Sequence, residues 1–294
     1  MTEPALKAVG LTKRYGRHLA LSGCTLDIPG GRVVGLVGPN GAGKTTLLQL
    51  AAGMLVPTAG SIEVLGGRPA TGPEQLARVG FVAQDTPTYA NLSVAEHLRF
   101  GASTNPRWDQ ATAQERITQL GLNPQQKAGR LSGGQRAQLA LTLAIAKRPD
   151  LLILDEPVAS LDPMARREFL KGLMGFTAEN KASVIMSSHL VSDLERVCDY
   201  LVVLVTSQIR VAGDVDDLLA GHFRLSGPRR DRTDLPDGVQ VIEESHVERQ
   251  STFIVRADAP IDDGSFTVDP LSLEDLVLAY MAQATTQPAE EAVR

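Results

Sequence analysis

The feature that most constrains the fold is a glycine-rich segment, Gly38–Thr45, with the sequence GPNGAGKT. It fits the pattern G-x-x-x-x-G-K-[ST] of a phosphate-binding loop. The apolar run Val33–Val37 before it predicts a buried strand. The segment Thr45–Ala52 after it predicts a helix that ends at Gly53. A strand, a glycine loop and a helix in this order build an anion site, and this context disfavours a purely structural turn.

The loop predicts a site for a nucleoside triphosphate with Mg²⁺. Glycines let backbone N–H groups turn toward an anion without a Cβ clash, and the helix N-terminus adds a partial positive charge. In this motif Lys44 reaches the β- and γ-phosphates, and the Thr45 hydroxyl is a ligand of Mg²⁺. The predicted nucleotide-binding residues of the loop are Gly38, Asn40, Gly41, Gly43, Lys44, Thr45 and Thr46.

A second motif supplies carboxylates. The run Leu151–Leu154 is too short for an ordinary helix and predicts a central parallel strand, which Asp155 and Glu156 follow directly. Because ligands bind beyond the carboxyl ends of the strands in open α/β sheets, both acids should lie at the nucleotide. Asp155 suits the Mg²⁺ shell, and Glu156 can orient the attacking water or take its proton. The alternative is an exposed acidic turn after a core strand.

A third motif, Leu131–Gln135 with the sequence LSGGQ, starts a segment of strong helix formers. Ser132 with Gln135 fits a capping box. Capping alone would not require the paired Gly133 and Gly134, since each glycine disfavours a helix by about 1 kcal/mol. The glycines leave backbone N–H groups open to an anion, so the chain contains two separate phosphate-binding helix starts.

Together these motifs resemble the ATP-binding-cassette (ABC) ATPases. Leu131–Gln135 is identical to the signature loop of that family, and the resemblance extends from about Leu6 to about Gly213. It implies an α/β P-loop NTPase cassette with a RecA-like parallel sheet core, an antiparallel β subdomain and a helical signature subdomain. It also implies ATP and Mg²⁺ as cofactors. The residues implied to grip the nucleotide of a partner cassette are Ser132, Gly133, Gly134 and Gln135.

Four further residues match functional positions of the family. The resemblance implies that Tyr15 stacks on adenine and that Asp162 belongs to a loop that faces a second cassette. It implies that Gln84 serves catalysis and Mg²⁺ binding, and that His189 is the switch histidine. Each also has a structural alternative. Tyr15 could be an ordinary strand aromatic, Asp162 a helix cap, Gln84 a turn residue and His189 a structural histidine with its hydrogen bonds made within the fold. The predicted catalytic residues are Glu156, His189 and Gln84, and the predicted metal ligands are Thr45, Gln84 and Asp155.

Strand–helix alternation predicts a parallel sheet in a nucleotide-binding domain of residues 1–221, with a helical subdomain at about 86–148. Residues 222–294 are predicted as a small C-terminal α/β extension. It is either an accessory layer that covers hydrophobic surface or a dimer or regulatory contact. Helices of the first domain are predicted at Asp109–Leu120, Pro163–Thr177 and Leu190–Val197. In the extension we predict a linker at Pro228–Arg232, strands at Val239–Ile242 and Phe253–Arg256, a helix at Leu273–Ala284 capped by Ser272, and a disordered tail at Thr285–Arg294.

Composition restricts the partners. A net charge of −5 argues against a nucleic-acid binder that uses a broad basic face. Two cysteines are too few for a disulfide framework, so a reducing cytosol fits. Met1–Pro4 lacks the features of a signal peptide, and no apolar run reaches the length of a membrane helix. If the protein drives transport, its membrane part is therefore another chain.

The resemblance implies the ATP-hydrolysing subunit of an ABC transporter, a translocase at the cytoplasmic face of the cell membrane. It implies pairing with a second ABC ATPase, identical or different, and membrane attachment only through a separate transmembrane permease. The tail sequence Leu273–Val277 is similar to that of bacterial export-type cassettes, which favours export. A soluble ABC ATPase of an assembly system, for example an iron–sulfur scaffold, shares the motifs and is the alternative. A GTPase is disfavoured, because Asn180–Ser183 lacks the acid of the guanine-reading N-K-x-D.

Overall fold

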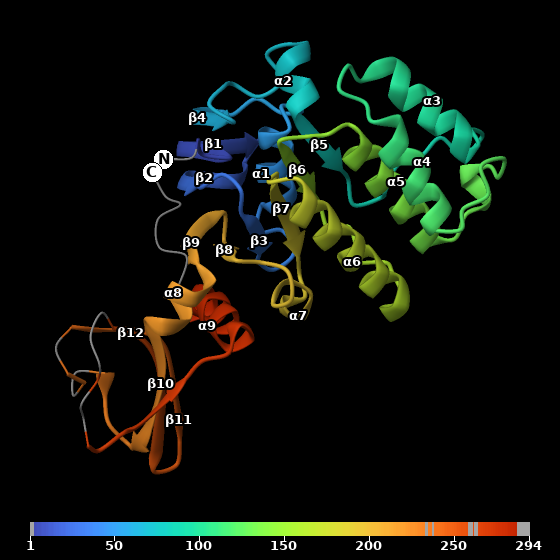
Figure 1. Cartoon of the computed structure of the whole chain (residues 1–294). Coiled ribbons are helices and arrows are strands. Elements are labelled where there is room, and N and C mark those ends of the chain that lie inside the picture. Colours follow the sequence, from blue (N-terminus) through green and yellow to red (C-terminus); the bar gives the residue numbers. More distant parts are fainter. Residues whose placement is uncertain (1–2, 233–234, 237, 258–260, 262–263, 287–294) are drawn as a thin grey trace.

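The computed structural model describes residues 3–232, 235–236, 238–257, 261 and 264–286. Figure 1 shows a central sheet with an antiparallel sheet at one end and a group of three helices at the other. A further antiparallel sheet, coloured orange, lies below the central sheet and belongs to the C-terminal part of the chain. Within the described residues, no helix is both long enough and apolar enough to cross a membrane.

The central sheet has six strands and is parallel except at one edge. β3 (Val33–Val37) pairs with β7 (Ser183–Ser188) on one side and with β8 (Tyr200–Val205) on the other, parallel to both. All residues of β3 and β7 are buried, which explains why their sequences do not alternate between apolar and exposed polar residues. The remaining strands are β5 (Val79–Val82), β6 (Leu151–Leu154) and the antiparallel edge strand β9 (Gln208–Asp214), in the order β5-β6-β7-β3-β8-β9.

Helices connect these strands at the positions that the sequence predicts. α1 (Lys44–Ala51) follows β3, and α6 (Pro163–Glu179) connects β6 to β7. Asp162 caps α6 by accepting hydrogen bonds from the N–H groups of Met164 and Ala165 at 3.0 Å. The predicted helix Leu190–Val197 is wrong in length, because the structure has only the single turn α7 (Val191–Leu194). The chain must turn early there, since the Asp199 carboxylate accepts from the Val33 N–H at 2.9 Å at the start of the central sheet.

An antiparallel sheet covers one end of the core. β1 (Leu6–Tyr15) lies between β2 (His18–Ile28) and β4 (Ala59–Val64). β2 alternates buried and exposed side chains toward its end, as a strand with one solvated face does. α2 (Pro73–Arg78) leads from this sheet into β5.

The helical part contains α3, α4, α5 and a short 3₁₀ turn. The predicted capping box at Ser132 with Gln135 is present, and a second capping box joins Ser93 to Glu96 at the start of α3. Asp109 caps α4, and Gly121 after it has a φ of 62°, a conformation in which glycine has no steric penalty. A small apolar cluster that includes Val94, Ile117 and Leu139 holds the helices together. Their bounds are α3 Val94–Thr104, α4 Gln110–Gln119, η1 Ala128–Arg130 and α5 Gly133–Ala146.

The C-terminal part is a four-stranded antiparallel sheet and a helix. The linker predicted at Pro228–Arg232 begins inside a strand, β10 (His222–Pro228), that the sequence analysis missed. The two predicted strands exist and pair with each other, but both are longer than predicted. The sheet has the order β11-β12-β10-β13, and α8 precedes it. The bounds are α8 Val215–Ala220, β11 Val239–Val247, β12 Gln250–Ala257, β13 Thr267–Pro270 and α9 Leu273–Thr286.

The helix α9 returns from this sheet to the main core. Ser272 caps it, accepting from the Asp275 N–H at 3.1 Å. Its side chains Leu276, Val277 and Tyr280 are buried in the same cluster as residues of the central sheet. Thr285 and Thr286 belong to α9, so the prediction of disorder was wrong for them, and residues 287–294 lie outside the described part.

Candidate nucleotide site

The predicted phosphate loop connects β3 to α1 at the carboxyl end of the sheet. Gly43 has a φ of 108°, and a Cβ at this position would collide with the carbonyl oxygen of Ala20. A Cβ at Gly38 would collide with the carbonyl oxygen of Leu204. Glycine is therefore required at both positions. Beside the loop is a pocket of about 400 Å³, lined by Tyr15, His18, Ala20, Asn40, Gly41, Ala42, Gly43, Lys44, Thr45, Thr46, Gln84 and Glu156.

The Lys44 ammonium has an acceptor for each of its three protons. It donates to the carbonyl oxygens of Gly38 at 2.8 Å and Pro39 at 3.3 Å. Its third neighbour is Glu156 Oε1 at 3.3 Å. Lys44 is only 5% exposed, so this ion pair is formed largely away from water. Phosphate oxygens that entered the loop would compete with these three acceptors for the same ammonium.

The two acids after β6 are held by the neighbouring strand β7. Ser187, fully buried, donates its hydroxyl to Asp155 Oδ1 at 2.8 Å and accepts the Glu156 N–H at 2.8 Å. Glu156 Oε2 lies 3.1 Å from His189 Nδ1, so the carboxylate joins Lys44 to His189. Glu156 has a φ of 43°, an uncommon conformation for a non-glycine residue that functional sites often contain.

The predicted metal ligands have the chemistry that Mg²⁺ prefers. Thr45 and Gln84 line the pocket with a hydroxyl and an amide, and Asp155 follows β6 as a buried carboxylate. All three offer hard oxygen donors, so they fit Mg²⁺ that shares its shell with phosphate oxygens and water. In the described part of the chain, no group of three or more His, Cys, Asp or Glu residues forms a cage for another metal.

The aromatic predicted to stack on a base lies at the rim of the same pocket. Tyr15 is 44% exposed, and Lys13 Nζ lies 5.2 Å from the centre of its ring. His18, its antiparallel partner across the β1–β2 turn, also lines the pocket. Sequence reasoning missed both His18 and Ser187. Their signals were a histidine directly after the turn at Tyr15 and a serine two residues before His189.

The LSGGQ turn is not part of this pocket. Ser132 Oγ accepts from the Gln135 N–H at 3.2 Å, and Gln135 Oε1 accepts from the Ser132 N–H at 2.9 Å. Ser132, Gly133 and Gln135 are exposed. Neither this turn nor Asp162 is among the described residues that line the phosphate-loop pocket. The two helix starts that the sequence predicts to bind anions therefore lie at separate places on one chain.

Comparison with known proteins gives consistent matches. The sequence profile of the family described as ABC transporter matches residues 21–159. The Nod factor export ATP-binding protein I of Rhizobium sp. (strain N33) is 34% identical over 230 residues, which span 76% of this chain and 75% of that protein. The sulfate/thiosulfate import ATP-binding protein CysA 1 of Agrobacterium fabrum is also 34% identical, over 72% of this chain and 64% of that protein. This chain thus matches less than two thirds of the importer subunit.

Solved structures agree with the fold. An ATP-binding subunit of an ABC transporter aligns with a TM-score of 0.65 and 28% identity, over 74% of this chain and 92% of that chain. CbiO1 of Clostridium perfringens, part of the ABC transporter complex cbiONQ, aligns with a TM-score of 0.64 and 27% identity, over 74% of this chain and 91% of that chain. The predicted fold class is confirmed by these matches.

Proposed function

This chain belongs to the family of ABC transporter ATP-binding proteins, which are ATPases, and from that premise we propose how it works. Two cassettes close on two ATP·Mg²⁺, hydrolyse them and drive a separate transmembrane permease. The observation that carries this proposal is the chain of contacts from Lys44 through Glu156 to His189 beside an exposed phosphate loop.

The residues divide the chemistry among them. Lys44 leaves Glu156 and the loop carbonyls for the β- and γ-phosphates, and the loop N–H groups bind the remaining oxygens. Glu156, released from Lys44, accepts the proton of the attacking water, and His189 holds this carboxylate in place. Thr45, Gln84 and Asp155 would hold Mg²⁺, which neutralises charge on the phosphates. Tyr15 stacks on the adenine ring.

The second anion-binding turn supports a paired arrangement. Ser132, Gly133 and Gln135 are exposed and the turn lies outside its own chain's pocket, so its N–H groups and the α5 N-terminus are available to a nucleotide held by a partner. Asp162 lies beside this partner in the proposed pair. ATP favours the closed pair, because only there does the triphosphate bind both turns, and hydrolysis removes that preference. The partner is a second ABC ATPase, either an identical chain or a different one.

An apolar groove supports a membrane partner. A cavity of about 450 Å³ lies between the sheet core and the helical part, and its lining includes Met54, Leu76, Pro87 and Leu143. Met54 is 59% exposed and Leu76 is 48% exposed, as expected of a contact surface without its partner. The groove adjoins the segment Gln84–Leu92, so a permease segment seated there would sense movements of Gln84. This contact would place the protein at the cytoplasmic face of the membrane.

We propose export as the direction. The match to the Nod factor export protein spans 75% of that protein, against 64% for the importer subunit. The C-terminal extension, residues 222–294, is proposed as an accessory part of the cassette domain, residues 1–221, because α9 buries its apolar face in the main core. The transported substrate class is set by the permease and not by these residues.

Affinity purification from the native membrane tests the proposal. A tagged full chain should bring down a polytopic membrane protein, and ATP turnover by the purified pair should require Glu156. The alternative of a soluble assembly ATPase predicts a soluble scaffold protein in the same experiment. Turnover that is independent of Glu156 would refute the assigned chemistry.

A further inference from the structure

Asp193 is a buried carboxylate whose charge is incompletely compensated. It lies in α7, one turn after His189, and is 6% exposed. Its Oδ1 lies 3.6 Å from a guanidinium nitrogen of Arg166, while its Oδ2 has no hydrogen-bond partner in the described part of the chain. Burial raises the pKa of Asp193. The charges of Arg166, His189 and Arg196 lower it, but by less, so the pKa remains above its usual value. A buried carboxylate is costly unless both of its oxygens are paired, so the Arg166–Asp193 ion pair leaves part of this cost uncompensated.

Arg166, its partner, belongs to the first turn of α6. Its backbone N–H donates to the Asp162 carbonyl oxygen at 2.9 Å, which fixes it to the loop proposed to face a second cassette. Its Nε is buried and also has no hydrogen-bond partner in the described residues. An arginine–carboxylate pair is strongest with two parallel N–H···O bonds. A small movement of the α6 turn toward α7 would therefore be favoured by completion of this pair.

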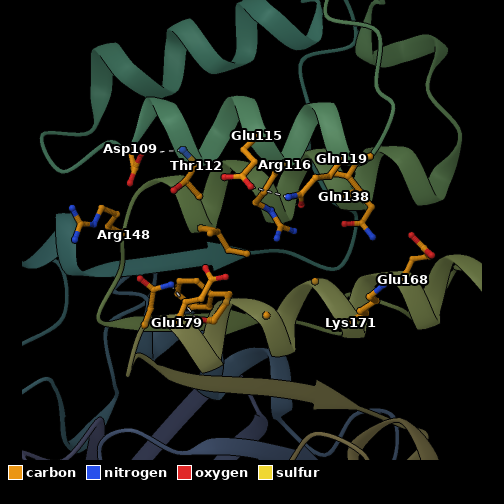
Figure 2. A pocket seen from close by; sticks show the side chains of 16 residues that line it. Asp109, Thr112, Glu115, Arg116, Gln119, Gln138, Arg148, Glu168, Lys171 and Glu179 are labelled. Carbon is orange, nitrogen blue, oxygen red and sulfur yellow. Dashed lines mark hydrogen bonds between the residues drawn. The ribbon is translucent and has the colours of Figure 1, made fainter.

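The same turn of α6 contacts the LSGGQ turn on another side. A Cβ added at Gly134 would lie 2.8 Å from the Cβ of Ala165, the residue before Arg166. Farther along α6 a cleft of about 520 Å³ is lined by residues of α4, α5 and α6 (Figure 2), while α5 and α6 also pack together in the main apolar cluster. Gln138, 7% exposed, lines this cleft, and neither of its amide atoms has a hydrogen-bond partner among the residues that the structure describes. The close Gly134–Ala165 approach links any displacement of the LSGGQ turn to the first turn of α6.

We propose that the Arg166–Asp193 pair couples the LSGGQ turn to His189 of the same chain. Engagement of Ser132–Gln135 by a partner's nucleotide shifts the first turn of α6, completes the pair and holds His189 against Glu156. Arg166 and Asp193 are positioning residues, since neither lines the phosphate-loop pocket. The inference rests on the proposed function, and its consequence is that the two ATP sites of a pair communicate through this contact.

The test uses the full chain with Asp193→Asn, Arg166→Gln and the double variant, and with Arg167→Gln as the matched control on an exposed neighbour. Turnover is measured against ATP concentration, and nucleotide affinity by titration of a fluorescent ATP analogue. We expect kcat to fall about 10- to 100-fold, the usual effect of a slight misplacement of a catalytic group. Affinity should not change, and the Hill coefficient should fall to about 1, because the sites become independent. The double variant should lose no more than either single variant, and Arg166→Lys should regain part of the turnover.

Three results would overturn either the coupling or the proposed function on which it rests. Normal kcat and an unchanged Hill coefficient in Asp193→Asn, with Glu156→Gln inactive, would overturn the coupling and leave the proposed function intact. Wild-type turnover in Glu156→Gln would instead overturn the proposed function. A loss of kcat that only follows the folded fraction measured by circular dichroism would assign the pair a structural role and also overturn the coupling. If Asp193→Asn does not fold, the same criteria apply to Arg166→Gln.

Discussion

The ion pair between Lys44 and Glu156 leads us to predict that the single substitution Glu156→Gln slows ATP turnover but tightens nucleotide binding. The amide keeps the size of the side chain but cannot take a proton from water, so ATP turnover should fall about 10²–10⁴-fold. The same change removes a charge 3.3 Å from the Lys44 ammonium. At an effective dielectric constant of about 20, that attraction is about 5 kcal/mol before desolvation is subtracted. If about a third of it, about 1.7 kcal/mol, remains as a net effect, nucleotide binds about 15- to 20-fold tighter, because phosphate no longer competes with Glu156 for Lys44.

The assay combines phosphate release with titration of a fluorescent ATP analogue on the purified full chain. Glu63→Gln, on the exposed side of β4, is the control and should leave turnover and affinity unchanged. Slower turnover together with tighter binding supports both roles of Glu156. Near-normal turnover refutes its role as the base. Weaker binding refutes the competition for Lys44, since loss of the ion pair can only release the ammonium.

Four further outcomes are expected. Lys44→Ala should weaken ATP binding about 10- to 100-fold in the same titration, because a charged hydrogen-bond donor to phosphate is lost; unchanged affinity contradicts this. Chelation of Mg²⁺ should abolish phosphate release and leave nucleotide binding measurable, as filter binding can check. Tyr280→Phe should lower the free energy of unfolding in urea by about 1–3 kcal/mol, because the hydroxyl lies 2.9 Å from the buried His222 Nε2; Tyr200→Phe is a control at an exposed hydroxyl. Burial lowers the pKa of His222, so the unfolded chain binds the proton more readily, and stability should fall as pH drops below about 6.5. Thermal unfolding over a pH series checks this, and His222→Gln should remove that part of the pH dependence.

The phosphate loop, the LSGGQ turn and the acids after β6 were recognisable from sequence because their chemistry is local. The left-handed φ of 108° at Gly43 and the Ser132–Gln135 capping box are local features, although the clash with Ala20 that also requires glycine at position 43 comes from a distant segment. The buried strands Val33–Val37 and Leu151–Leu154 were equally clear, since strands covered on both faces are continuous apolar runs.

Elements that depend on distant partners were predicted less well. β10 was not predicted, and its last residue was placed in a linker, because this segment becomes a strand only by pairing between β12 and β13. α7 ends after one turn because Asp199 must reach the N–H of Val33, far away in the sequence. Ser187 received no role, although it holds both Asp155 and Glu156, because its position two residues before His189 does not by itself show that its strand lies beside β6.

The sequence by itself determined the segments in which we predict the triphosphate-binding groups, since the backbone geometry of these short segments is set largely by their own residues. Only the tertiary structure decided how those groups meet. It brought Lys44, Glu156 and His189 into one line of contacts from three separate strand ends. It also placed Arg166 against Asp193, each with one atom that has no hydrogen-bond partner among the described residues. The reason is that parallel strands with crossover helices gather remote residues at one edge of a sheet, and the distances there follow from packing that no local pattern encodes.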